Sequence, residues 1–313
     1  MQRRLHQSSR SLFPSYRSLS EDEFRARVSR AYEILKNCNL CPRNCGVNRL
    51  EGKRGFCRTL QKPVVSSWGP HFGEERPLVG RGGSGTIFFT HCNLGCVFCQ
   101  NYTISHLGEG EEISTRRLAS IMLELQQMGC HNINLVTPTH QVPMIMEALL
   151  VASQQGLQLP VVYNSGGYES IETLRLLEDI VDIYMPDIKY ADPEVAKRLS
   201  LAEDYPEVAK RAVKEMHRQV GDLIINEEGI ALRGLLVRHL VLPEGLAGTE
   251  EVVRFLAEEI SKETYVNIMN QYYPCYRASE FPPLNRRITS KEFIEALELA
   301  KKAGLKRIDG VTV

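Results

Sequence analysis

Residues 86–101, TIFFTHCNLGCVFCQN, carry the clearest signal in this 313-residue chain. Cys92, Cys96 and Cys99 follow an apolar run with the spacing C-x3-C-x2-C. Iron–sulfur cubes held by four cysteines are closed, so three cysteines on one loop leave one iron of a [4Fe–4S] cluster free for a non-protein ligand. An open position is typical of a catalytic metal site. The spacing therefore predicts a catalytic iron–sulfur centre directly after a strand.

A structural zinc site is the alternative for this loop, with His91 as a fourth ligand. Zinc loops usually bring C-x2-C pairs together from two sides, and only one such pair is present here. The C-x3-C-x2-C loop instead resembles the signature of the radical S-adenosylmethionine (SAM) superfamily, in which SAM chelates the fourth iron. The resemblance implies that Phe98, the aromatic residue before the last cysteine, packs beside the adenine of SAM.

The composition is that of an ordinary globular enzyme, with 43% hydrophobic and 24% charged residues. Lysine plus arginine balance aspartate plus glutamate at 38 each, so no charge excess indicates nucleic acid or an anionic membrane as partner. No apolar run reaches the roughly 18 residues of a membrane-spanning helix. Nine cysteines, most of them in metal-like spacings, indicate a reducing compartment, and we expect a cytoplasmic protein.

Three segments are expected along the chain. Residues 1–20 are rich in arginine and serine, and we predict a disordered tail, although an organelle transit peptide has the same composition. Residues 21–85 combine an amphipathic helix at 21–35, a cysteine-rich segment and a Gly/Pro-rich connector. Residues 86–313 form the main domain.

Short β-branched runs alternate with longer helical stretches from residue 86 onward. Strands are predicted at 86–90, 132–137, 160–164, 181–186, 234–242 and 265–269, with a weaker one at 305–308. Helices are predicted at 115–128, 142–154, 169–178, 206–220, 250–261 and 290–302, the last with a capping box. This alternation predicts an α/β fold with a parallel sheet, a partial (β/α)6 TIM-type barrel with a small N-terminal metal-binding segment. The chemistry of such barrels lies at the carboxyl ends of the strands, where the cysteine loop is expected.

Polar residues stand at the ends of all five later strands of this predicted barrel. They are found in the segments 137–140 (TPTH), 163–168 (YNSGGY), 185–190 (MPDIKY), 237–243 (VRHLVLP) and 270–272 (NQY). One such end would be an ordinary turn, but five together predict a lined pocket.

The order of these segments resembles the pyruvate formate-lyase activating-enzyme-like radical SAM proteins, and within them an uncharacterised branch with an N-terminal cysteine cluster. The resemblance runs over about residues 16–309 and is strongest at 41–46 (CPRNCG), in the cysteine loop and at 237–243. It implies that Asp187 and Lys189 contact the ribose or carboxylate of SAM. It also implies that Arg238, whose planar fork suits a carboxylate, pairs with the SAM carboxylate.

One motif of that family is absent. The Gly-Gly-Glu sequence that binds the amino group of SAM would stand at the end of the second strand, where this chain has TPTH. We expect the contact to come from Thr139 or from backbone oxygens, or in part from the Gly166–Gly167 turn.

A second cysteine set precedes the barrel. Cys38, Cys41, Cys45 and Cys57 have the spacing C-x2-C-x3-C-x11-C. Four thiols within twenty residues can close around zinc or around a second iron–sulfur cluster, and the sequence leaves both open. A cluster could relay electrons to the SAM site, whereas zinc would fasten the N-terminal segment to the barrel.

The resemblance implies a radical SAM oxidoreductase with a [4Fe–4S] cluster, SAM and a second metal. Such an enzyme reductively cleaves SAM to a 5′-deoxyadenosyl radical, which abstracts hydrogen from a substrate that the sequence does not identify. Activation of a glycyl-radical enzyme is one option. Expected partners are an electron donor such as a flavodoxin or ferredoxin and a protein substrate. The alternative is a non-catalytic iron–sulfur electron carrier or assembly scaffold, which would not need polar strand ends.

Overall fold

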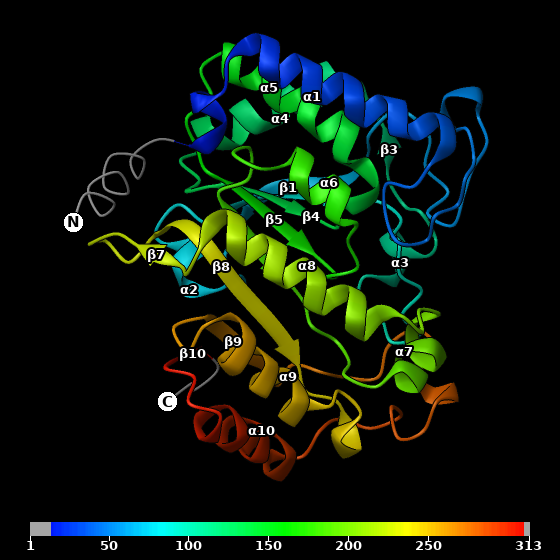
Figure 1. Cartoon of the computed structure of the whole chain (residues 1–313), viewed down its shortest axis with the longest axis vertical. Coiled ribbons are helices and arrows are strands. Elements are labelled where there is room, and N and C mark those ends of the chain that lie inside the picture. The colour runs from blue at the N-terminus through cyan, green and yellow to red at the C-terminus, as the bar shows by residue number, and fades with distance from the viewer. Residues whose placement is uncertain (1–13, 310–313) are drawn as a thin grey trace.

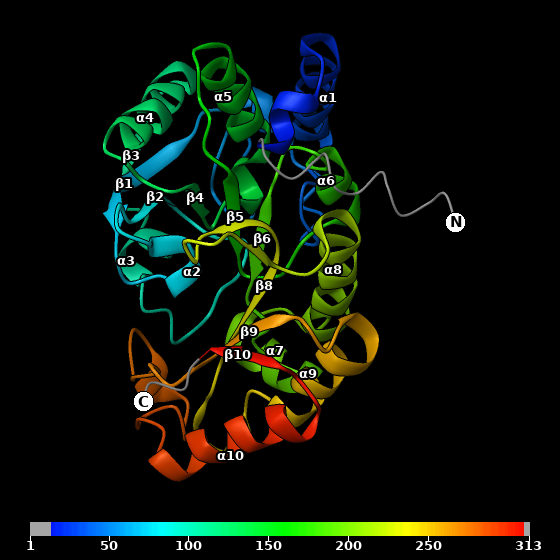
Figure 2. The same cartoon turned by 90° about the vertical axis from the view of Figure 1, so that its left-hand side faces the viewer.

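A twisted, mostly parallel sheet forms the centre of the protein, and helices cover its outer face (Figures 1 and 2). The computed structural model describes residues 14–309. The strands are β1 (Val64–His71), β2 (Ser84–Phe89), β3 (Glu111–Glu112), β4 (Ile133–Val136), β5 (Val161–Ser165), β6 (Ile183–Pro186), β7 (Ile224–Ile225), β8 (Ala231–Leu240), β9 (Tyr265–Met269) and β10 (Arg307–Asp309). Their order in the sheet is β10-β9-β8-β6-β5-β4-β2-β1-β3, with β7 paired to β8.

All six predicted barrel strands are present. β2, β4, β5, β6, β8 and β9 pair in parallel in this order, and β10, the weaker seventh strand, extends the sheet beside β9. β5 and β6 are buried along their whole length, as expected for parallel strands covered on both faces. The sheet does not close on itself. These features confirm the prediction of an α/β partial barrel.

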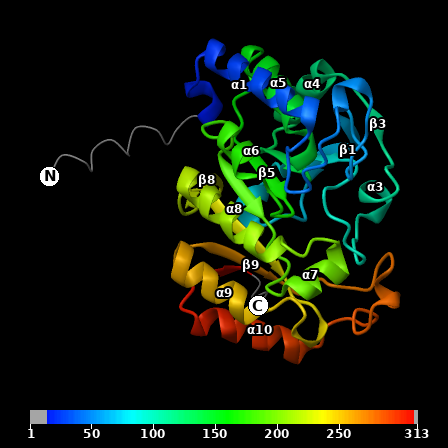
Figure 3. The same cartoon turned by 45° about the vertical axis from the view of Figure 1, so that its right-hand side comes forward.

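The helices form the outer layer of the barrel, as Figure 3 shows for α1, α4, α5 and α8. The helices are α1 (Glu21–Ile34), α2 (Arg76–Val79), α3 (Tyr102–Ser105), α4 (Thr115–Gln127), α5 (Val142–Gln154), α6 (Ile171–Leu176), α7 (Pro193–Ser200), α8 (Tyr205–Val220), α9 (Thr249–Phe255) and α10 (Ser290–Lys302). The capping box of α10 is confirmed, since Thr289 and Glu292 exchange both hydrogen bonds. The predicted helix at 250–261 is α9 followed by a π-helical turn, Leu256–Ile260. No helix among residues 14–309 has the length and apolar character needed to cross a membrane.

The N-terminal part differs from the expectation in two places. The disordered tail expected over 1–20 does not extend to residues 14–20, while residues 1–13 lie outside the described part. Ser15–Ser18 form a 3₁₀ turn in which Tyr16 is buried, and its hydroxyl donates to the Leu159 carbonyl over 3.0 Å. Burial of Tyr16 and its hydrogen bond thus hold this stretch against the rest of the protein, despite the basic composition of the N-terminal segment.

The second difference is β1, which lies within the predicted Gly/Pro-rich connector and pairs antiparallel with β2 and β3. Gly69 and Pro70 are residues that disfavour a strand prediction. Most residues of β1 are not buried, so the sequence shows no apolar alternation there. The sheet therefore extends across residue 85, the boundary expected between the N-terminal segment and the barrel.

Candidate active site

The three cysteines of the C-x3-C-x2-C motif lie in the loop between β2 and α3, residues 90–101, which we call the cluster loop. Each thiol has a hydrogen-bond donor beside it. The backbone N–H of Leu94 donates to Cys92 Sγ over 3.3 Å, Ser200 Oγ donates to Cys96 Sγ over 2.9 Å, and Cys99 Sγ lies 3.1 Å from Ser105 Oγ. Hydrogen bonds of this kind stabilise metal-bound thiolates and tune iron–sulfur clusters. The donor set therefore fits an iron–sulfur cluster.

No three His, Cys, Asp or Glu side chains in the described part of the chain are placed to hold a single metal ion. The cysteines of a [4Fe–4S] cube bind different irons and need not converge on one point. Burial, together with the neighbouring Cys96, raises the pKa of the Cys92 and Cys99 thiols. Since metal ligation requires thiolates, cluster binding must release protons at this loop.

A pocket of about 350 Å³ lies beside the cluster loop at the carboxyl ends of the strands. Its volume is within the range of small-molecule and cofactor sites. We call it the strand-end pocket; residues that line it include Cys96, Phe98, Cys99, Asp187, Lys189 and Arg238. Four predicted SAM contacts, from three separate segments, thus meet two of the predicted iron ligands.

Asp187 is the centre of an ionic network in this pocket. Its carboxylate accepts from Lys189 Nζ over 2.6 Å and from Arg238 Nε over 3.0 Å. Burial alone would raise the pKa of Asp187, but the charges of Lys189 and Arg238 outweigh it and hold the pKa below its usual value. Glu74, which lies 3.3 Å from Arg238 in the same pocket, adds a second carboxyl group beside the two positive side chains. The N–H groups of Lys189 and Arg238 are donors of the kind that bind a ligand carboxylate.

Phe98 forms an aromatic wall of the same pocket. Its side chain packs edge-on against Tyr190 and Tyr272, with ring centroids 6.3 and 5.9 Å away. These contacts fix the orientation of the ring, which is 6% exposed. A rigid aromatic side chain beside two thiols suits the flat face of a nucleobase.

The residues predicted to replace Gly-Gly-Glu do not line the strand-end pocket. Thr139 is buried, and its hydroxyl donates to Glu169 over 2.7 Å. Gly167 has φ +75°, and a Cβ there would lie 2.4 Å from the carbonyl oxygen of Asp187. This turn lets the chain pass close to the end of β6. The role of Thr139, Gly166 and Gly167 toward SAM stays a prediction.

Sequence reasoning missed Glu74 and Glu75, which follow β1. Glu74 lines the pocket and lies 3.3 Å from Arg238, and Asn267 on β9 donates to Glu75 over 2.8 Å. These contacts join the β1–α2 segment to strands β8 and β9 on the opposite side of the open barrel. Because β1 has no apolar alternation in the sequence, no local signal places the residues after it at the site. Asn164, which accepts from Arg238 over 2.8 Å, stood in a polar strand end but was given no role.

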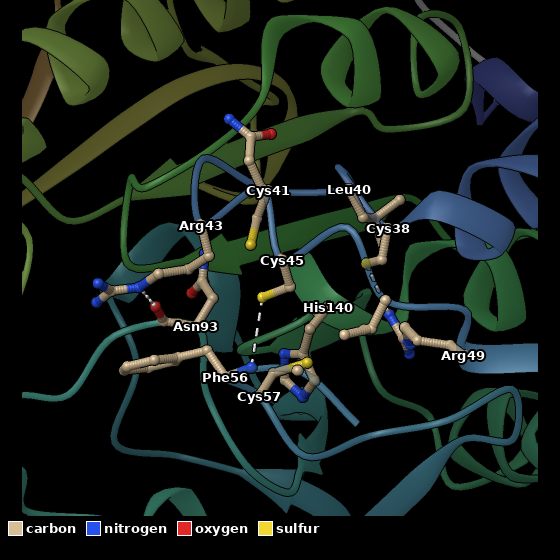
Figure 4. A pocket seen from close by; sticks show the side chains of 13 residues that line it. Cys38, Leu40, Cys41, Arg43, Cys45, Arg49, Phe56, Cys57, Asn93 and His140 are labelled. Carbon is tan, nitrogen blue, oxygen red and sulfur yellow. Dashed lines mark hydrogen bonds between the residues drawn. The ribbon is translucent and has the colours of Figure 1, made fainter. Parts of the chain in front are cut away.

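The four N-terminal cysteines surround a separate cavity. Figure 4 shows Cys38, Cys41, Cys45 and Cys57 together with Arg49 and His140, all of which line it. The four predicted ligands thus line one cavity, which we call the N-terminal cysteine pocket; their side chains do not converge on a single point. Cys45 Sγ accepts from the backbone N–H of Phe56 over 3.4 Å, and burial raises the pKa of Cys41 to about 12. Whether it takes zinc or an iron–sulfur cluster stays open.

Fold and pocket together define an α/β-barrel protein with a thiol-lined ligand site. Residues 86–226 match the radical SAM superfamily. A relative from Methanocaldococcus jannaschii, Uncharacterized protein MJ0674, is 37% identical over 288 residues, which cover 89% of this chain and 78% of the relative. The chain belongs to the radical SAM superfamily. Its class is thus that of enzymes that use SAM and an iron–sulfur cluster, which confirms the coarser part of the sequence prediction.

Other similar proteins are more distant. Uncharacterized protein MJ0808 from the same organism is 22% identical over 303 residues, covering 89% of this chain and 82% of that protein. The structure of native anSMEcpe with bound AdoMet aligns with 70% of this chain and 61% of its own, at TM-score 0.48 and 9% identity. HydG, a maturase of the [FeFe]-hydrogenase, aligns with 92% of this chain and 62% of its own, at TM-score 0.47 and 10% identity. This chain spans about three fifths of each of these solved structures.

Proposed function

We propose that the strand-end pocket binds SAM against a [4Fe–4S] cluster held by Cys92, Cys96 and Cys99. The observation that supports this most directly is the convergence of Phe98, Asp187, Lys189 and Arg238 with two of the three cysteines on one pocket. When bound, the cluster supplies the electron that cleaves SAM to methionine and a 5′-deoxyadenosyl radical.

The residues of the chain orient SAM and exclude water. Arg238 and Lys189 offer positive charge to the SAM carboxylate, and Asp187 keeps both side chains in place while offering an acceptor to the ribose hydroxyls. Phe98 positions the adenine. Leu240, Leu242 and Met269 belong to the apolar part of the lining, and we expect them to limit the access of water to the radical.

Hydrogen abstraction from a substrate is the chemistry that this radical would supply, and we propose on this ground that the protein is a radical SAM oxidoreductase. The finer assignment we propose is an activating-enzyme-like protein that acts on a glycyl-radical enzyme and takes electrons from a flavodoxin or ferredoxin in the cytoplasm. The support for it is the sequence resemblance alone. We also propose that the segment 21–85 holds a second metal, zinc or iron–sulfur, at Cys38, Cys41, Cys45 and Cys57.

The test is anaerobic reconstitution of the full chain with iron and sulfide, followed by SAM and dithionite. We expect a cluster at the cluster loop whose electron paramagnetic resonance (EPR) spectrum changes on SAM addition, and production of 5′-deoxyadenosine. The C92A/C96A/C99A variant should lose both while keeping the metal of the N-terminal pocket. A fully loaded protein that undergoes reduction but forms no 5′-deoxyadenosine would instead be an electron carrier or scaffold, and the enzyme proposal would be wrong.

A further inference from the structure

The N-terminal cysteine pocket and the cluster loop are direct neighbours. Asn93, the residue after Cys92, lines the N-terminal cysteine pocket. A further cavity between the two regions is lined by both Cys57 and Cys92. In the sequence, 34 residues separate Cys57 from Cys92. In the fold, residues of the two cysteine sets line the same cavity.

His140 connects the two sets from the η4 turn (Thr139–Gln141) that follows β4. Its Nε2 lies 2.8 Å from the carbonyl oxygen of Thr90, two residues before Cys92, and donates a proton there. The amide of Gln141, 3.3 Å from the same nitrogen, donates to this carbonyl as well. Nδ1 therefore carries a lone pair. This atom is fully buried and has no hydrogen-bond partner, and the side chain lines the N-terminal cysteine pocket. An unpartnered buried acceptor costs free energy, which a metal or a metal-bound ligand in the pocket would recover.

Arg49 gives an independent sign that this pocket holds negative charge. Its side chain is 1% exposed and donates to Thr59 Oγ1 over 3.0 Å and to the Leu60 carbonyl, with Cys38 Sγ 4.0 Å away. No carboxylate among residues 14–309 forms an ion pair with it. A buried, uncompensated guanidinium is costly, and four thiolates around a metal supply the missing negative charge.

Arg43 forms the second connection, since it stands between Cys41 and Cys45 and reaches the cluster loop. It follows Cys41 by two residues in the loop that carries the first cysteine set. Its guanidinium donates to the Asn93 carbonyl over 2.8 Å and to the Ser200 carbonyl over 3.1 Å. The hydroxyl of the same Ser200 donates to Cys96 Sγ. Arg43 thus connects the loop that carries the first set to the backbone beside Cys92 and to the hydrogen-bond partner of Cys96.

We propose that the two cysteine sets form one coupled unit, in which His140 and Arg43 transmit metal binding at the N-terminal cysteine pocket to the position of the cluster loop. His140 Nδ1 takes part in the N-terminal site, as a metal ligand or as an acceptor toward the bound group. This inference rests on the proposed function for the identity of the second site as the SAM cluster. Because linkage is reciprocal, occupation of either site strengthens the other.

The coupling can be measured without SAM chemistry. In the full-length C92A/C96A/C99A variant only the N-terminal pocket retains its cysteines, and amide hydrogen exchange of residues 90–101 is recorded before and after addition of Zn²⁺, and separately after reconstitution with iron and sulfide. We expect metal binding to slow exchange in this segment by about fivefold or more, the lower range of typical coupling between sites. Both probes are needed because four thiols are ligands for zinc and for an iron–sulfur cluster alike.

Three variants separate the two connections. Arg43→Lys keeps the charge but cannot reach both carbonyls, and we expect metal to bind while the effect on residues 90–101 disappears. His140→Gln keeps a donor toward Thr90 but lacks the Nδ1 lone pair, so the affinity for metal should fall. In His140→Asn, whose amide oxygen can take the place of the Nδ1 lone pair, we expect the affinity for metal to be regained. Arg54→Lys, an exposed arginine of the same loop, serves as the matched control and should behave like the parent protein.

Two results would overturn the inference. One is metal binding in the C92A/C96A/C99A variant that leaves exchange at residues 90–101 unchanged. The other is an Arg43→Lys or His140→Gln variant that matches Arg54→Lys in both metal affinity and exchange. Neither result depends on 5′-deoxyadenosine formation, so failure of the coupling and failure of the proposed enzyme activity are distinguishable.

Discussion

Asp187 and Arg238 face each other across the ends of β6 and β8, as a parallel bridge in the backbone and as an ion pair with Nε and Oδ1 3.0 Å apart. The bridge fixes both side chains at one depth in the strand-end pocket. The same guanidinium reaches Asn164 on β5, so Arg238 spans three strands of the sheet.

Replacement of Arg238 tests the carboxylate contact. Arg238→Lys keeps a positive charge but loses the fork that holds Asp187 and Asn164, and SAM affinity should fall roughly 10- to 100-fold, the value of one or two charged hydrogen bonds. Equilibrium dialysis of SAM with anaerobic, cluster-loaded protein measures this. The control is Arg218→Lys on α8, an exposed arginine paired with Glu215. Equal SAM affinity in both variants would remove Arg238 from the site.

The hydroxyl of Ser200 should influence the redox potential of the cluster. A hydrogen bond to a cysteine sulfur favours the reduced, more negative cluster, so Ser200→Ala should lower the midpoint potential. Loss of a bond on the order of 1 kcal/mol corresponds to roughly 40 mV for one electron. Redox titration followed by EPR measures the shift. Ser153→Ala, whose hydroxyl donates only to the Leu150 carbonyl, is the control, and a shift of equal size there would contradict the assignment.

Gly167 should resist substitution for two separable reasons. Gly167→Ala places a Cβ 2.4 Å from the Asp187 carbonyl at φ +75°, whereas Gly156→Ala has a similar φ of +97° with nothing within 4 Å. The Gly156 variant should lose about 1 kcal/mol from backbone strain alone, and the Gly167 variant clearly more, because the end of β6 must move. Urea unfolding compares the two. Similar losses would show that the close approach to Asp187 does not matter.

The buried carboxyl of Glu169 should make stability depend on pH. Burial raises its pKa to about 7 despite hydrogen bonds from Thr139 and Tyr163, whereas an unfolded glutamate titrates near 4.3. The folded state therefore holds this proton longer. The stability contributed by Glu169 is full below about pH 4.3 and is lost as pH rises through about 7.

The isosteric variant Glu169→Gln has no such proton to lose. Between pH 5 and pH 7.5, the free energy of unfolding should fall less in this variant than in the parent protein, by up to about 3 kcal/mol. Urea unfolding at both pH values measures the difference. The exposed Glu109→Gln variant is the control and should follow the parent protein. An unchanged pH dependence in Glu169→Gln would mean that Glu169 titrates normally in the fold.

The sequence predicts the parallel core of this fold well and its polar contacts poorly. The observed bounds of β9, α5 and α10 equal the predicted ones, because local periodicity and a capping box determine them. The contact of Arg238 with Asp187 depends instead on the register of β6 beside β8, which no local pattern encodes. β1 lacks apolar alternation, so the acidic residues after it could not be placed at the pocket.

The same distinction applies to the cysteines. Spacing alone indicated two sets of metal ligands, since short loops keep neighbouring thiols close. The lone pair of His140 and the reach of Arg43 arise from segments that meet only in the folded chain. For this reason the sequence predicts both sets of ligands but not the contacts that connect them.

The contacts of Glu74 with Arg238 and of Glu75 with Asn267 cover one side of the open barrel. Along this line side chains join the segment after β1 to β8 and β9, where a closed barrel would have a ladder of backbone hydrogen bonds. Each such contact is worth about 1–3 kcal/mol, and salt weakens the charged one. Widening the pocket along this seam therefore leaves every strand paired.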